Sequence, residues 1–137
     1  MPLPAHRIRL RGPWRATIAD GSQPPTQMAI PCSLREGGWV GVAGRVSFYR
    51  RFGRPSNLGP TESVWLVLEH LATEAEVRLN EKLMGDSASS REFDITGILL
   101  DRNEVSIAMP VADDAGGLVG EVVLEIRVSA EPAAAGQ

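Results

Sequence analysis

Apolar and polar residues alternate along short segments of the chain, and this period of two is the feature that most constrains the fold. In SVWLVLEHL, for example, Val64, Leu66 and Leu68 share one face of an extended chain. Fourteen glycines and ten prolines lie between such segments and mark turns. This pattern is typical of an all-β domain. The expected strands cover residues 7–11, 14–18, 27–31, 45–52, 63–71, 75–80, 103–109 and 118–128.

About eight short, mainly antiparallel strands with turns between them predict a β-sandwich or jelly roll. The 137 residues fit a single domain, which we place at 1–130. A chain of this length buries enough surface to form a core without disulfides. Residues 131–137, rich in alanine, are expected to be a disordered tail.

Charge and cysteine content argue against several classes of function. The formal net charge is −3 and the pI is about 5.4, so the chain lacks the basic field that nucleic acid requires. The single cysteine, Cys32, cannot form an internal disulfide. The N-terminus has no apolar run typical of a secretory signal, and no segment approaches the roughly 18 apolar residues of a membrane span. These features predict a soluble cytoplasmic protein.

Five segments follow one another in a familiar order, and the similarity extends from Gly12 to Val128. They are GPWRATI, MAIPCSL, GRVSFYRRF, VWLVLEHLATEAEVRLNEKLMG and FDITGILLDRNEVSIAM. In this order the chain resembles the N-terminal sugar-binding-type domain of family 2 glycoside hydrolases, the β-galactosidase and β-glucuronidase group. The resemblance implies a galactose-binding-like jelly roll. It does not imply hydrolysis, because the barrel domain with the two catalytic glutamates of the family has no counterpart in the sequence.

The chain departs from the family at Asn80-Glu81, where the family usually has Asn-Gly. Asn-Gly suits a tight turn because both residues tolerate a positive φ, which glutamate adopts only at a cost. We therefore expect a wider turn, or a turn in which Asn80 alone is left-handed.

Residues of the FDIT segment are predicted to support the fold. Phe93 and Ile95 are expected to be buried, whereas Asp94 and Thr96 are expected to accept backbone N–H groups beside the turn that follows. Trp14 is likewise predicted to lie in the core.

A glycine-rich loop at 32–44 contains Trp39 together with Arg35 and Glu36. Sugar rings stack on indole rings while charged side chains bind hydroxyl groups, so the three residues form a candidate carbohydrate site. A structural alternative is favoured for Trp39 itself, in which the indole folds back as a plug over one end of the sandwich.

The polar loop 85–92 adds Asp86 and Arg91 to the candidate carbohydrate site. Its serines and charged side chains offer many hydrogen-bonding groups. A plain solvated loop explains the same composition and is the favoured alternative.

Trp65 and Val67 are predicted to point away from the core, because their neighbours Val64, Leu66 and Leu68 point into it. An outward tryptophan beside a valine indicates a covered surface. The cover is either a second protein or the chain's own termini, and the sequence favours neither.

Metal, cofactor and catalytic sites are not expected. His6 and His70 lie far apart, and Asp113 and Asp114 fall short of the six to eight oxygens that calcium requires. No nucleophilic triad, phosphate loop or dinucleotide fingerprint occurs. The arginines at 50, 51 and 54 are expected to form a solvated strand face.

The sequence therefore predicts a non-catalytic module that binds carbohydrate through loops at one end of a β-sandwich. The alternative is a protein-interaction or assembly module, with a partner or a second copy at the sheet face around Trp65.

Overall fold

The computed structural model of the chain describes residues 4–70, 73–86 and 91–128. Within these residues it consists of ten strands and one short 3-10 helix. In chain order the elements are β1 (Pro4–Arg9), β2 (Trp14–Ile18), β3 (Thr26–Met28), β4 (Gly44–Gly53), β5 (Glu62–Leu68), β6 (Glu76–Leu79), β7 (Lys82–Asp86), β8 (Glu92–Asp94), η1 (Thr96–Ile98), β9 (Arg102–Val111) and β10 (Val122–Val128).

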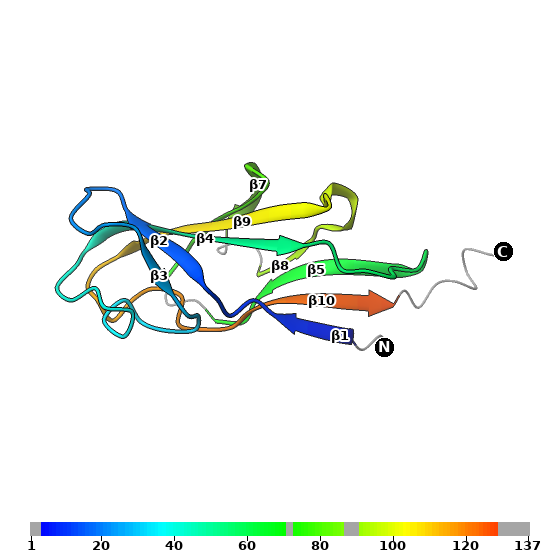
Figure 1. The fold of residues 1–137 in the computed structure, drawn as a ribbon, viewed down its shortest axis with the longest axis horizontal. Coiled ribbons are helices and arrows are strands. Elements are labelled where there is room, and N and C mark those ends of the chain that lie inside the picture. The colour runs from blue at the N-terminus through cyan, green and yellow to red at the C-terminus, as the bar shows by residue number, and fades with distance from the viewer. Residues whose placement is uncertain (1–3, 71–72, 87–90, 129–137) are drawn as a thin grey trace.

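The strands form two sheets that pack face to face, as Figure 1 shows. One sheet has four strands in the order β1-β10-β5-β8, and the other has six in the order β3-β2-β4-β9-β6-β7. Neighbouring strands are antiparallel throughout. The predicted all-β sandwich is therefore confirmed.

The alternation in the sequence sets the two faces of each sheet. In β5 the inward residues Val64, Leu66 and Leu68 are at most 2% exposed, because they pack against the inner face of the other sheet. Trp14 is fully buried, as predicted, and its Nε1 donates a hydrogen bond to the carbonyl oxygen of Leu10 at 2.6 Å. The core is one continuous cluster that both sheets share.

The FDIT segment supports the fold as predicted. Phe93 and Ile95 are buried. Asp94 Oδ1 accepts the amide of Thr96 at 3.0 Å, and Thr96 Oγ1 accepts the amide of Val64 at 2.8 Å. These bonds tie η1 to the adjacent strand β5.

The turn at Asn80-Glu81 differs from the prediction. Asn80 has φ 52° and Glu81 has φ 70°, and the two residues alone connect β6 to β7. This is the tight two-residue hairpin that favours Asn-Gly, with glutamate in the glycine position. The expectation of a wider turn, or of one left-handed residue, was wrong because strand pairing on both sides holds the turn closed despite the local cost.

Candidate functional site

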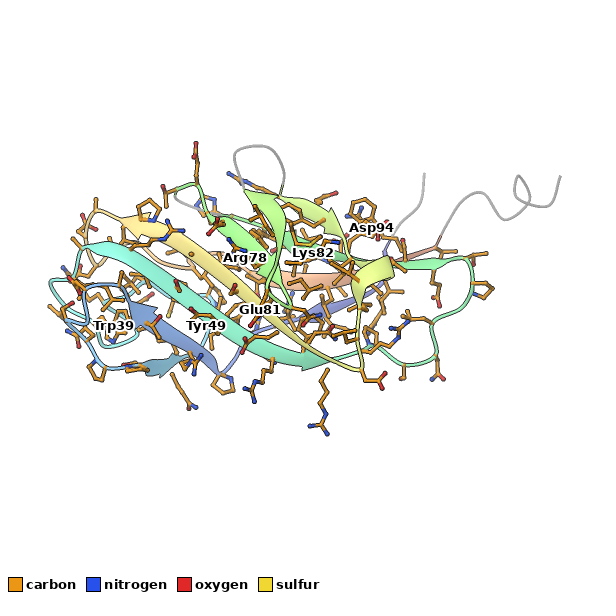
Figure 2. All side chains as sticks on the ribbon, turned by 90° about the horizontal axis from the view of Figure 1, so that it is seen from above. Trp39, Tyr49, Arg78, Glu81, Lys82 and Asp94 are labelled. Carbon is orange, nitrogen blue, oxygen red and sulfur yellow. The ribbon has the colours of Figure 1, made fainter. Side chains whose placement is uncertain are left out.

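Trp39 lies inside the sandwich end and not on its surface. The side chain is 2% exposed, and its Nε1 donates a hydrogen bond to Thr26 Oγ1 at 2.9 Å. Figure 2 shows Trp39 among the loops at one end of the molecule. An indole in this position has no free face on which a sugar can stack. The plug interpretation accounts for Trp39, and the stacking role proposed for it is corrected.

The polar neighbours of Trp39 bond to the protein itself. Ser33 and Glu36 form a reciprocal capping box, in which the Ser33 amide donates to Glu36 Oε1 at 2.8 Å and the Glu36 amide donates to Ser33 Oγ at 3.1 Å. Glu36 therefore stabilises the turn in its own loop. This bonding differs from the ligand-facing role that the sequence indicated for Glu36.

Arg35 binds Asp114 on a second loop, so that residues 32–41 and 113–118 form one unit, the end loops. Arg35 Nε and Nη2 lie 3.1 and 2.9 Å from Asp114 Oδ1, and the Gly41 amide donates to Asp114 Oδ2 at 2.7 Å. The bond from the Gly41 amide, followed by that from Arg35, lowers the pKa of Asp114. Arg35 is thereby engaged in holding the loops together.

The remaining two predicted ligand residues lie on other elements. Asp86 ends β7 opposite Glu76. Arg91 precedes β8, and its carbonyl oxygen accepts the amide of Leu68 at 2.9 Å. Residues 87–90 of the predicted polar loop lie outside the described residues. The hollow beside Arg35 is lined by residues of the end loops, without Arg91.

The outer face of the four-stranded sheet holds Trp65 and Val67, as the alternation predicted. Val67 is only 7% exposed and its cross-strand neighbour Val123 only 1%. The Arg127 guanidinium lies 4.4 Å from the centre of the Trp65 ring, and Trp65 Nε1 donates to Ser63 Oγ at 3.0 Å. The protein's own side chains therefore cover much of this surface.

Five charged residues form this cover, which we call the outer ion network. Glu125, 8% exposed, lies between two arginines: its Oε2 is 3.1 Å from Arg7 Nε and its Oε1 is 2.7 Å from Arg127 Nη2. Arg7 also binds Glu69, and Arg127 also binds Glu92 at 3.1 Å. The hydrogen bond with Glu69 raises the pKa of Arg7. Carboxylates and guanidinium groups alternate along the network, so each of its charges is paired within the protein.

The outer face of the six-stranded sheet has a different character. One cross-strand row reads Arg15, Tyr49, Ser106 and Arg78 on β2, β4, β9 and β6. The Arg15 guanidinium lies 4.9 Å from the centre of the Tyr49 ring. On the other side of Tyr49 stands Ser106, which has a short side chain, and Tyr49 itself is half-buried and lines an open hollow. Figure 2 shows Tyr49 and Arg78 on the two sides of β9.

Arginines outnumber carboxylates on this surface, which we call the arginine face. Glu76 forms ion pairs with two arginines, Arg45 at 3.2 Å and Arg78 at 3.4 Å. Glu104 lies 3.6 Å from Arg51. Strand register places five arginines on the arginine face, namely Arg15, Arg45, Arg51, Arg78 and Arg102.

Two adjoining open hollows lie at the end of the arginine face where β4 ends and β9 begins. The first, about 550 Å³, is lined by Arg51, Phe52, Gly53, Asn80, Arg102, Asn103 and Glu104. The second, about 430 Å³, is lined by Pro13, Trp14, Arg15, Gln27, Tyr49, Arg50, Arg51 and Glu104. Because Arg51 and Glu104 line both, the hollows form one continuous surface beside Tyr49.

Sequence reasoning missed the arginine face, although the signal was present. The alternation in β4 placed Ser47, Tyr49 and Arg51 on one side, and Arg50 on the core side, as the structure has them. The arginines were interpreted as a solvated strand face. What the sequence did not reveal is that Arg15, Arg78 and Arg102 from three other strands share that side.

Two general features of the described residues complete the picture. No three histidine, cysteine, aspartate or glutamate side chains among them lie together as metal ligands. No helix in the described part of the chain is long and apolar enough to cross a membrane.

Known proteins resemble this chain in structure only. No protein-family model matches the sequence, and no curated protein matches it. The FMN-binding β-glucuronidase from Facaelibacterium prausnitzii L2-6 matches with a TM-score of 0.75 and 20% identity, over 90% of this chain and 22% of that chain. The β-glucuronidase of Bifidobacterium dentium matches with a TM-score of 0.71 and 20% identity, over 93% and 31%.

A β-D-mannosidase from Dictyoglomus thermophilum matches with a TM-score of 0.69 and 14% identity, over 87% of this chain and 22% of that chain. These neighbours are family 2 glycoside hydrolases, as the resemblance in the sequence implied. The chain spans less than a third of the length of each of the three. The likeness establishes the sandwich fold and no more.

Proposed function

We propose that this chain is a non-catalytic domain that binds carbohydrate on the arginine face, with a sugar ring stacked on Tyr49. The observation that carries the proposal is the position of Tyr49 between Arg15 and the short Ser106. An aromatic ring with room beside it accepts the apolar face of a sugar. Arginine and serine side chains around it supply hydrogen bonds to hydroxyl groups.

The fold gives this proposal its context. The solved neighbours are named as β-glucuronidases and a β-mannosidase, enzymes of carbohydrates. Because the same fold serves unrelated functions, the proposal rests on the residues of the arginine face. The neighbours contribute only the choice of carbohydrate as the class of ligand to test.

The spacing of carboxylates on the arginine face supports a role in binding without hydrolysis. Glu76 on β6 lies opposite Ala108 of β9. Glu104 is on β9 itself, four residues before Ala108. Four residues of extended chain span about 13 Å. Glycoside hydrolysis requires two carboxyl groups about 5 to 9.5 Å apart on opposite sides of the scissile bond.

The alternative, an assembly surface around Trp65 and Val67, has less support. Val67 is 7% exposed. Arg127, which lies over Trp65, is held there by two carboxylates, whereas Arg15 over Tyr49 has no ion-pair partner among the described residues. A partner would have to displace the outer ion network before it reached these apolar side chains, at a cost in broken charge-assisted hydrogen bonds.

A glycan array and affinity electrophoresis test the proposal. We expect the parent protein to bind at least one class of glycan and Tyr49→Ala to bind about tenfold more weakly, because the stacking ring is lost. Tyr49→Phe keeps the ring and should retain binding. Trp65→Ala removes an aromatic ring from the other outer face and should leave binding unchanged. A folded parent that retains no glycan, or a Tyr49→Ala variant that binds like the parent, would overturn the proposal.

A further inference from the structure

The hollow of about 550 Å³ at the Arg102 end of the arginine face holds more positive than negative charge. Arg51 and Arg102 line it together with one carboxylate, Glu104. Arg51 faces Glu104 across the β4–β9 pair, but the two side chains are 3.6 Å apart and that of Arg51 is 88% exposed. Arg102 has no ion-pair partner among the described residues. The hollow therefore has two guanidinium groups and one carboxylate, and that carboxylate pairs with Arg51 alone among the described residues.

The wall of this hollow is held by bonds within the protein. Asn103 is 3% exposed, and its Oδ1 accepts the Leu100 amide at 2.8 Å and Asn80 Nδ2 at 3.0 Å. Asn80 Oδ1 in turn accepts the Glu104 amide at 2.9 Å. The backbone that carries Arg102 and Glu104 is therefore fixed before any ligand arrives, which lowers the entropic cost of binding.

The hollow continues toward the residue proposed to stack a sugar. Arg51 lies two residues beyond Tyr49 on the same side of β4, about 7 Å along the strand. It lines both the hollow beside Tyr49 and the hollow beside Arg102. A ligand that stacks on Tyr49 therefore reaches the two guanidinium groups with its neighbouring substituents or its next residue.

We infer that the glycan bound by this domain is acidic, and that one of its carboxylate or sulfate groups binds between Arg51 and Arg102. This inference rests on the proposed function and deepens it. Guanidinium groups bind carboxylates and sulfates through paired N–H donors, and such charge-assisted bonds are stronger than those to hydroxyl groups. The other arginines of the arginine face extend the same positive surface.

An acidic glycan fits this surface better than a nucleic acid does. An acidic sugar needs one aromatic ring for stacking and a few guanidinium groups for its charge. Single-stranded nucleic acid requires several aromatic platforms. Tyr49 is the one tyrosine of the sequence.

Isothermal titration with three polymers tests the inference: polygalacturonate, which carries carboxylates, dextran sulfate, which carries sulfates, and neutral dextran. We expect at least one acidic polymer to bind and the neutral polymer to bind at least tenfold more weakly. Arg51→Gln and Arg102→Gln should each weaken acidic binding about tenfold. Arg9→Gln is the matched control, since it removes the same charge from an exposed arginine on the other outer face.

The outcomes separate this inference from the proposed function. Binding of carboxylated or of sulfated polymer identifies which acidic group is preferred. Equal binding of a neutral glycan, with no effect of either arginine change, would overturn the acidic ligand and leave the role of Tyr49 intact. Absence of binding to any glycan would overturn both. Tighter binding of a short single-stranded DNA than of either acidic glycan would overturn the choice of ligand class.

Discussion

The end loops and the arginine face contain the same kinds of side chain and use them differently. In the end loops Arg35 binds Asp114, and Trp39 is buried with its N–H bonded to Thr26. On the arginine face Tyr49 stands beside a short serine, and Arg51 contacts its carboxylate only at 3.6 Å. Polar groups that already have partners inside the protein gain little from a ligand. The two regions therefore differ in whether their side chains can bind a ligand, more than in the types of residue that they contain.

Removing the aromatic ring from each region is the strongest test of this difference. Trp39→Ala should lower the free energy of unfolding by about 3 to 5 kcal/mol, because it empties a buried site. Tyr49→Ala should lower it by less, about 1 to 2 kcal/mol, since that ring is only half-buried on the outer face of the sheet. Urea denaturation followed by circular dichroism measures both. Equal losses would contradict the distinction between a structural end and an open face.

A second test concerns the turn beside the arginine face. Glu81 holds φ 70°, so Glu81→Gly should raise the free energy of unfolding by about 0.5 to 1 kcal/mol by relieving the strain of a left-handed glutamate. Glu81→Ala is the control, because alanine has the same restriction and should bring no such gain. A Gly variant no more stable than the Ala variant would show that the turn is unstrained.

The smallest effect is expected in the end loops at acid pH. Hydrogen bonds lower the pKa of folded Asp114 below its ordinary value of 3.8, so its stabilising contribution is present above that value. The contribution is lost as pH falls through the folded pKa. Arg35 is 69% exposed, and solvent therefore screens the pair. As pH falls below about 4, the free energy of unfolding should therefore decrease more steeply in the parent than in Asp114→Asn. Parallel pH profiles would argue against the effect.

Local sequence patterns predicted most of the fold. Alternation identified the strands that became β2, β4, β5, β6 and β9, and it placed Phe93 and Ile95 in the core. The strands β7 and β8 were missed because KLMGD and EFD are short and lack a clear alternation. Their extended conformation comes from pairing with β6 and β5, which a single segment does not reveal.

The candidate site was harder to predict for a related reason. The sequence lists Arg35, Glu36 and Trp39 as neighbours but does not reveal that Asp114, far along the chain, bonds to Arg35. Conversely, Tyr49 and Arg15 meet only through the register of β2 with β4. Whether a side chain is open to a ligand depends on such long-range pairs, so alternation alone predicts the face of a residue and not its availability.

The position of β10 in the four-stranded sheet has a consequence for how the protein folds. β10 is the last described strand of the chain, and it lies between β1, the first, and β5. During synthesis, the edges of β1 and β5 that pair with β10 therefore remain unpaired until residues 122–128 emerge. Contacts of such long sequence separation slow folding and leave strand edges open to other chains. The domain completes this sheet only when nearly all of the described chain has been made.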